Sequence, residues 1–156
     1  MEFIGYNVWK SQKQREAEMI VGIIGGGASG MAAALAASEN PQAKIVLMER
    51  QARVGRKLQA TGNGRCNLTN LHAHAQGYHG EDPVFPQYAL QRFAPEDTLS
   101  WFRQMGLFTV AEESGRVYPY SDQANSVVDI LRFALDKGNI QLKTGFEAEK
   151  ISRTEG

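Results

Sequence analysis

Three glycines near the start of the chain have the spacing with which a protein backbone holds a diphosphate. Gly25, Gly27 and Gly30 fit the pattern G-x-G-x-x-G. In this pattern the first glycine permits a tight turn, the second lets the backbone approach a pyrophosphate, and the third lets a helix pack closely on a strand. Amides from Ala28 onward would face the phosphates at the positive end of the helix dipole. The motif therefore predicts a dinucleotide site, and the alternative is a glycine-rich turn that serves packing alone.

An acidic residue stands where the same chemistry requires one. Glu49 lies 19 residues after Gly30, at the end of the next apolar run. There a carboxylate can accept hydrogen bonds from both hydroxyl groups of an adenosine ribose, and it repels a 2′-phosphate. Together, the acid and the glycines favour dinucleotide binding over packing alone, and they disfavour NADP at this place.

The segments around these residues follow the order of a βαβ unit. Residues 19–24 and 44–48 are short apolar runs typical of buried parallel strands, and the alanine-rich residues 28–38 favour a helix. We therefore expect an α/β fold that begins with a parallel sheet. Residues 19–156 are predicted to form the N-terminal part of an FAD/NAD(P)-binding domain. Residues 1–18 have no hydrophobic face and are predicted to be an extension outside the fold.

Beyond the second strand the pattern becomes less regular. Residues 51–82 are rich in Gly, Asn and Thr, so we expect mostly loop, and a loop this long in a compact domain is usually functional. Asp122 is the predicted N-cap of an amphipathic helix. The expected elements are helices over 85–93, 95–105 and 122–137, a hairpin of 108–112 with 116–118, and strands over 140–143 and 146–151.

Composition narrows the class of protein. Of the 156 residues, 42% are hydrophobic and 22% are charged, as in a single globular domain. Basic and acidic residues number 17 each, so net charge does not indicate a nucleic-acid partner. No apolar run reaches the roughly 20 residues of a membrane span. With one cysteine the chain has no intramolecular disulfide. We expect a cytoplasmic protein with no membrane partner.

The cysteine and three histidines are further candidates for chemistry. Flavin disulfide reductases use two nearby thiols, so a lone Cys66 excludes that reaction within the chain. A thiolate whose pKa is lowered by Arg65 stays open, although a packed cysteine is the favoured interpretation. His72, His74 and His79 have no cysteine or suitably spaced carboxylate nearby, so no metal site is predicted.

The glycine motif and four later blocks carry a resemblance to a known family. The blocks are Glu49-Arg50, Gly55-Arg-Lys57, Thr61-Gly-Asn-Gly-Arg-Cys-Asn67 followed by Thr69-Asn70, and Gly115-Arg-Val-Tyr-Pro119. With them the chain resembles the N-terminal portion of bacterial NAD(P)/FAD-dependent oxidoreductases of the BaiN/RdsA type, also called aminoacetone-oxidase-like FAD-binding enzymes. The resemblance extends to about Ile151, and the block from Thr61 to Asn70 is its most distinctive part.

The resemblance implies a partial, truncated FAD-binding Rossmann-like domain with FAD as cofactor. It implies flavin-mediated hydride or electron transfer on a small-molecule or nucleobase substrate, with NAD(P)H as a candidate electron donor. The substrate and the catalytic residues stay unidentified. It also implies that the loop after Glu49 borders the pyrophosphate, the ribityl chain or the flavin ring, and that Ala148 meets the adenine. The expected cofactor-binding residues are Gly25, Gly27, Ala28, Ser29, Gly30, Glu49, Arg50, Arg56, Lys57, Thr61, Gly62, Asn63, Gly64, Arg65, Cys66, Asn67 and Ala148.

Two other functions stay open at this point. One is a non-catalytic fragment that binds ADP-like ligands, and the other is an NAD-dependent dehydrogenase. Members of the resembled family are roughly twice as long or more, as expected of complete α/β dinucleotide enzymes. We therefore expect the enzymatic activity to need a missing C-terminal half, which another chain could supply.

Overall fold

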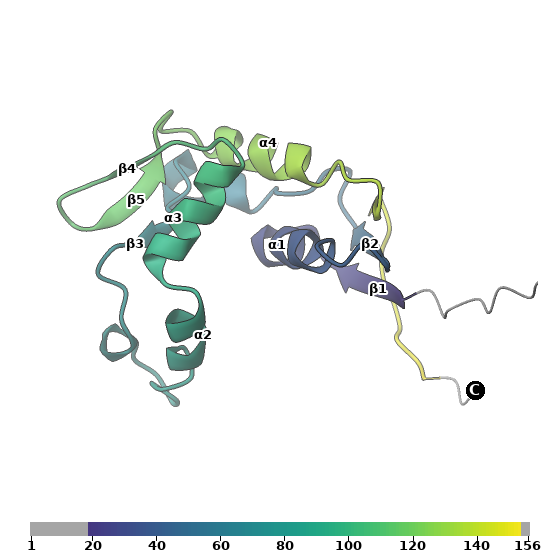
Figure 1. The fold of residues 1–156 in the computed structure, drawn as a ribbon, viewed down its shortest axis with the longest axis horizontal. Helices are drawn as coiled ribbons and strands as arrows, with labels where there is room; N and C mark the ends of the chain where they lie inside the picture. Colours follow the sequence, from purple (N-terminus) through teal and green to yellow (C-terminus); the bar gives the residue numbers. More distant parts are fainter. Residues whose placement is uncertain (1–18, 154–156) are drawn as a thin grey trace, which may run out of the picture.

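A short parallel sheet and the helix across it form the centre of the fold. The structure, a computed structural model, describes residues 19–153. Strands β1 (Met19–Ile24), β2 (Ala43–Glu49) and β6 (Ile140–Thr144) pair in the order β1-β2-β6, and both pairs are parallel. Helix α1 (Ala28–Ala37) connects β1 to β2 and lies beside them (Figure 1). The predicted βαβ unit with a parallel sheet is thus confirmed.

The hydrophobic core lies between one face of this sheet and two helices. Ile45 and Leu47 of β2 are fully buried, as is Met31 of α1. Helix α4 (Ala124–Ala134) adds Val127 to the same cluster. Helix α4 is amphipathic and buries one apolar stripe, whereas α1 consists almost entirely of small or apolar residues and buries the side that carries Met31 and Leu35.

The opposite face of the sheet is open along β1. Ile20 and Ile24 are 63% and 54% exposed, whereas Val21 and Ile23, which alternate with them, pack against the core. Parallel sheets are normally covered on both faces. The described residues therefore leave an apolar strip of this sheet in solvent.

A small antiparallel sheet forms a second layer beside the core. Its strands β3 (Thr69–Asn70), β5 (Arg116–Pro119) and β4 (Thr109–Ala111) pair in the order β3-β5-β4. The predicted hairpin is the β4–β5 pair. In sequence, the 3-10 segment η1 (Leu58–Gly64) lies between β2 and β3. The 3-10 segment η2 (Ala75–Gly77) and the short helices α2 (Gln87–Arg92) and α3 (Pro95–Gln104) lie between β3 and β4. In Figure 1, α2 lies well away from the parallel sheet.

The strand predicted over 146–151 is wrong. Residues 146–153 have no regular secondary structure. Gly145 has a φ of +66°, which turns the chain out of the sheet after β6. The Phe146 amide then donates to the Glu49 carbonyl over 3.0 Å, so the segment crosses the end of β2 instead of extending the sheet.

The predicted N-cap of α4 is also wrong. The helix begins at Ala124 after Gln123, and no side chain caps it. The Asp122 carboxylate instead accepts a hydrogen bond from Arg65, 57 residues earlier in the chain.

The extension predicted over 1–18 lies outside the described residues. Within 19–153, the helices are all too short or too polar to cross a bilayer.

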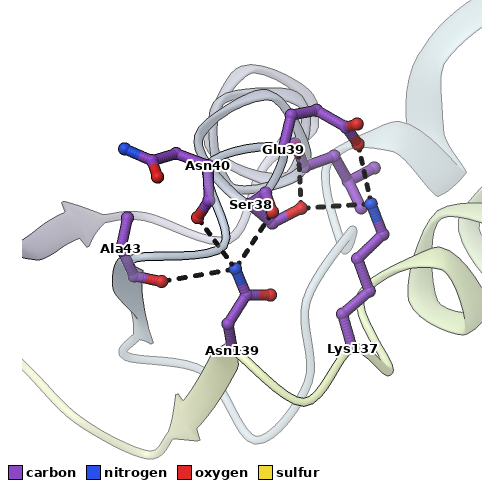
Figure 2. A network of polar contacts seen from close by, with 7 residues as sticks. Ser38, Glu39, Asn40, Ala43, Lys137 and Asn139 are labelled. Atoms are coloured by element: carbon purple, nitrogen blue, oxygen red, sulfur yellow. Dashed lines mark hydrogen bonds and ion pairs between the residues drawn. The ribbon is translucent and has the colours of Figure 1, made fainter.

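Asn139 joins three elements at the amino ends of the strands (Figure 2). Its side-chain amide lies 3.0 Å from the carbonyl oxygen of Ser38, 3.4 Å from that of Asn40 and 3.3 Å from that of Ala43. Its own carbonyl accepts from the Ile45 amide over 2.8 Å. Asn139 thus connects the end of α1, the start of β2 and the start of β6, and so helps to set how β6 lies against β2.

Lys137 adds a positive charge to the same junction. Its ammonium group lies 3.1 Å from the Ser38 hydroxyl and 2.9 Å from a Glu39 carboxylate oxygen (Figure 2). A cation at this place also faces the negative end of the α1 dipole.

We predict that Asn139→Ala lowers the free energy of unfolding by about 1–3 kcal/mol, because partly buried carbonyl groups lose their donor. Urea unfolding would measure the change. Gln42→Ala is the matched control, since the Gln42 side chain is exposed in the same region, and we expect it to change stability by less than about 0.5 kcal/mol. Equal urea midpoints for the two variants would contradict the role assigned to Asn139.

Candidate functional site

The glycine motif forms the turn between β1 and α1. Gly25 has a φ of +99° and donates its amide to the Met48 carbonyl over 2.7 Å, which turns the chain at the end of β1. Gly27 precedes α1 in an extended conformation. Within the described part of the chain, no side chain caps the start of α1 and its first turn has no acidic residue. The first amides of a helix have no partner inside the helix, so this end can bind an anion.

Close approach explains which glycines the fold itself requires. A Cβ at Gly30 would lie 1.8 Å from the Gly25 carbonyl oxygen, and one at Gly26 would lie 2.4 Å from a Val54 methyl group. A Cβ at Gly27, in contrast, would meet nothing within 4 Å. Gly26 and Gly30 are therefore needed for packing, whereas the space beside Gly27 is open to a ligand.

The Glu49 carboxylate is held at the end of β2. One of its oxygens accepts the Gly26 amide and the other accepts the Gln51 amide, each over 2.7 Å. The Gln51 amide is the largest cause of a lowered Glu49 pKa, and the Gly26 amide and the charge of Arg50 act in the same direction, against partial desolvation. The carboxylate is thus ionised at neutral pH, and each oxygen keeps a lone pair for a ligand hydroxyl.

A cavity of about 650 Å³ opens at the carboxyl ends of the strands. In open α/β sheets this is the place where ligands bind. Its walls come from the glycine turn, the end of β2, the start of η1 and the segment after β6. The lining residues are Ile24, Gly25, Gly26, Gly27, Met48, Glu49, Arg50, Gln51, Arg56, Lys57, Ala60, Phe146, Glu147 and Ala148.

The structure brings seven of the predicted site residues to this cavity. They are Gly25, Gly27, Glu49, Arg50, Arg56, Lys57 and Ala148. Ala28 and Ser29 are exposed at the start of α1, next to the lining residue Gly27. The sequence analysis did not predict the other seven lining residues, which are Ile24, Gly26, Met48, Gln51, Ala60, Phe146 and Glu147. The position of Gln51 directly after Glu49-Arg50 was an available signal, whereas Phe146 was assigned to a strand.

The cavity has three cationic side chains in its walls. Arg56 donates a hydrogen bond to the Gln51 side-chain oxygen over 2.8 Å, and both residues line the cavity. Arg50 lies 3.8 Å from Glu147, with 68% and 69% of the two side chains exposed. Lys57 is exposed. These cations exceed the two carboxylates of the lining by one, so the walls favour an anionic ligand.

The predicted loop residues 61–67 are not among the residues that line the cavity. Cys66 is 2% exposed, and burial raises the pKa of its thiol although a hydrogen bond from Thr61 acts in the opposite direction. The reactive thiolate is therefore the wrong interpretation, and Cys66 is a packed thiol. Arg65 bonds to Asp122 and Glu112.

In the described chain, no group of three His, Cys, Asp or Glu residues is placed to hold a metal ion.

Comparison with known proteins identifies relatives that match most of this chain. The family model described as "HI0933-like protein Rossmann domain" matches residues 19–156. A 3-dehydro-bile acid delta(4,6)-reductase from Clostridium scindens is 45% identical over 132 residues, which is 84% of this chain and 32% of the relative. A ribosomal RNA dihydrouridine synthase from Escherichia coli is 30% identical over 133 residues, 85% of this chain and 33% of the relative. The chain thus spans about a third of the length of these relatives.

A solved structure has a similar fold. Thermovibrio ammonificans THI4 matches with a TM-score of 0.50 and 15% sequence identity, over 81% of this chain and 38% of its own. At this identity the likeness concerns the fold alone. It supports the Rossmann-type arrangement of the parallel sheet.

We predict that Glu49→Gln destabilises the protein at pH 7 by about 1–3 kcal/mol, because the new amide nitrogen would face a backbone N–H that has lost its acceptor. The pKa of Glu49 is lower in the folded chain than its ordinary value of 4.5. Its ionised form therefore stabilises the fold above that value, and this contribution is lost as pH falls through the folded pKa.

Urea unfolding of both proteins from pH 7 to pH 3 would measure this dependence. The difference between wild type and Glu49→Gln should narrow below about pH 5. Glu147→Gln is the control, because its carboxylate lies in the same wall but is largely exposed. A stability difference that stays constant across the pH range would contradict the assigned ionisation.

Proposed function

The chain belongs to the HI0933-like Rossmann-domain family, and from that premise we propose that it binds FAD as the N-terminal cofactor-binding part of a flavin-dependent oxidoreductase. One observation carries the proposal above the others. Gly27, next to the uncapped start of α1, and the ionised Glu49 carboxylate line one cavity, and Glu49 follows Gly30 by 19 residues, a spacing typical of dinucleotide sites. The proposed domain covers residues 19–156.

The adenosine half of FAD fits the residues that are present. Its diphosphate would lie beside Gly27, where the protein leaves space, and accept hydrogen bonds from the first amides of α1. Its ribose hydroxyls would donate to Glu49. The adenine would then meet the wall formed by Phe146 to Ala148, since the Phe146 amide is bonded to the Glu49 carbonyl.

The flavin half is assigned to the segment that follows Glu49. Arg56 and Lys57 line the cavity and precede the glycine-rich residues 61–67, so an extended cofactor that runs from the diphosphate along this wall would reach those residues next. When bound, a flavin supplies hydride or electron transfer, and the protein holds and orients it. NAD(P)H is the proposed electron donor.

Family membership and topology favour this function over the NAD-dependent dehydrogenase. In this chain η1 and an antiparallel sheet come between β2 and β6, instead of a second βα unit directly after the acid. The names of two relatives, a bile acid reductase and a dihydrouridine synthase, support reduction of a small organic or nucleobase substrate by the whole protein. The cytoplasmic location stays a prediction.

We propose further that activity needs polypeptide equivalent to the other two thirds of the relatives, from the same or another chain. The open face of β1, with Ile20 and Ile24 more than half exposed, is an apolar surface that such polypeptide would cover. Substrate-binding and catalytic residues would then come from it.

Titration of the purified protein with FAD tests the cofactor assignment. We predict saturable binding with the absorption bands of a protein-bound flavin, and at least tenfold weaker binding by Gly27→Ala, because its methyl group would occupy the space of the diphosphate. The fold should tolerate this change, since Gly27 has a φ of −78° and a Cβ there meets nothing within 4 Å.

Gly138→Ala is the matched control, because a Cβ at Gly138 also meets nothing within 4 Å and the residue lies outside the cavity lining. Its FAD affinity should equal that of wild type. No flavin binding at saturating FAD, or equal affinities of wild type and Gly27→Ala, would reject the proposal. Binding of NADH in place of FAD would favour the dehydrogenase.

A further inference from the structure

The side chain of Arg65 bonds to two acidic residues that are distant in the sequence. Its Nε donates to Asp122, which precedes α4, and its Nη2 donates to Glu112 of the β4–β5 hairpin over 2.8 Å. The guanidinium carbon lies 3.8 Å from the centre of the Tyr118 ring, and Tyr118 is 6% exposed. Two carboxylates and an aromatic face thus contact a cation that was expected to bind the cofactor.

These contacts make Arg65 a poor ligand for phosphate. The two carboxylates more than neutralise its charge, so an incoming anion would be repelled by them as well as attracted by the guanidinium. They also raise the pKa of Arg65, with the bond to Asp122 as the largest cause. Arg65 is, in addition, not among the residues that line the cavity.

Arg65 lies in a turn with an unfavourable backbone. Gly62 and Asn63 have φ values of 55°, and Cys66 has a φ of 63°. Non-glycine residues adopt this left-handed region at a cost, so the turn from Thr61 to Cys66 persists only where other contacts hold it. Inside the turn, the Cys66 amide donates to the Thr61 carbonyl over 3.1 Å.

The residues just before this turn, at the start of η1, form part of the cavity wall. Lys57 directly precedes η1 and Ala60 lies within it, and both line the cavity. The Gln59 side chain donates to Asn125 of α4 over 2.8 Å. Two polar contacts, Gln59 with Asn125 and Arg65 with Asp122, therefore hold η1 and the turn that overlaps its end to the beginning of α4.

We propose that Arg65 is a positioning residue: by binding Asp122 and Glu112 it holds the Thr61–Cys66 turn, and through η1 it fixes the wall that Lys57 and Ala60 present to the flavin side of the cofactor. The role at the cofactor rests on the proposed function. The role in holding the turn rests on the side-chain contacts alone, so the two can be tested apart.

Cys66 supplies a reporter that needs no cofactor, because it is the only cysteine of the chain, is 2% exposed and lies in the turn. We expect Arg65→Gln and Asp122→Asn each to raise the rate at which a disulfide reagent labels Cys66 in the folded protein by at least tenfold. The double variant should be labelled no faster than the faster single variant, since each change alone already breaks the same Arg65–Asp122 contact. Arg132→Gln, which removes an exposed ion pair with Asp129 on α4, is the control and should leave the rate unchanged.

Urea unfolding of each variant separates opening of the turn from loss of the whole fold. The increase in labelling should exceed the change in the unfolding equilibrium constant. A labelling rate within twofold of wild type for Arg65→Gln, or an increase that matches the change in unfolding constant, would overturn the proposal.

Binding of FAD and of ADP by the same variants tests the role at the cofactor. Arg65→Gln and Asp122→Asn should each weaken FAD binding at least fivefold and ADP binding less than twofold, since ADP lacks the flavin half. If Arg65→Gln weakened both ligands equally while Asp122→Asn weakened neither, Arg65 would be a direct phosphate ligand and the proposal would fail. If wild type bound no FAD, the proposed function would fail, and the labelling rates would still decide whether Arg65 holds the turn.

Discussion

The hydrogen bond from the Gly26 amide to the Glu49 carboxylate is the contact around which the candidate site is arranged. It joins the ends of β1 and β2, and it requires Gly26, since a Cβ there would meet Val54. With the glycine turn held in this way, the start of α1 faces the cavity without a side-chain cap. The carbonyl of Glu49 also accepts the Phe146 amide, so one residue organises the ends of β1 and β2 and the segment after β6.

The two ends of the parallel sheet contribute differently: the amino ends carry contacts that connect α1, β2 and β6, and the carboxyl ends form the cavity. At the amino ends, Asn139 connects α1, β2 and β6. This contact is remote from the cavity, but it determines where β6 begins and hence where its far end places Phe146 to Ala148. At the carboxyl ends, the polar groups of Glu49 and Gln51 and the nearby cations form the ligand-facing surface. Asn139 thus contributes to stability at one end of the sheet, whereas Glu49 contributes to stability and to the candidate site at the other.

Local patterns were sufficient to predict the parts of the site that are close in sequence. The spacing of the glycines and the apolar runs predicted the βαβ unit, and the position of Glu49 after the second run placed it at the mouth of the turn. Tertiary contacts decided the rest. Arg65 in a glycine-rich loop has the appearance of an anion ligand, but its partners Glu112 and Asp122 lie 47 and 57 residues away. The apolar residues after Gly145 predicted a strand, and the left-handed turn at that glycine sent them into the cavity wall instead.

The central claim is that the start of α1 holds a diphosphate while Glu49 holds the neighbouring ribose. The most direct measurement is a titration of the isotope-labelled protein with ADP, followed by the backbone amide signals in NMR spectra. We predict the largest shifts at Gly27, Ala28 and Ser29, together with shifts at Gly26 and Gln51, whose amides bind the Glu49 carboxylate. Saturation of the protein with ADP while these five amides stay unchanged would contradict it.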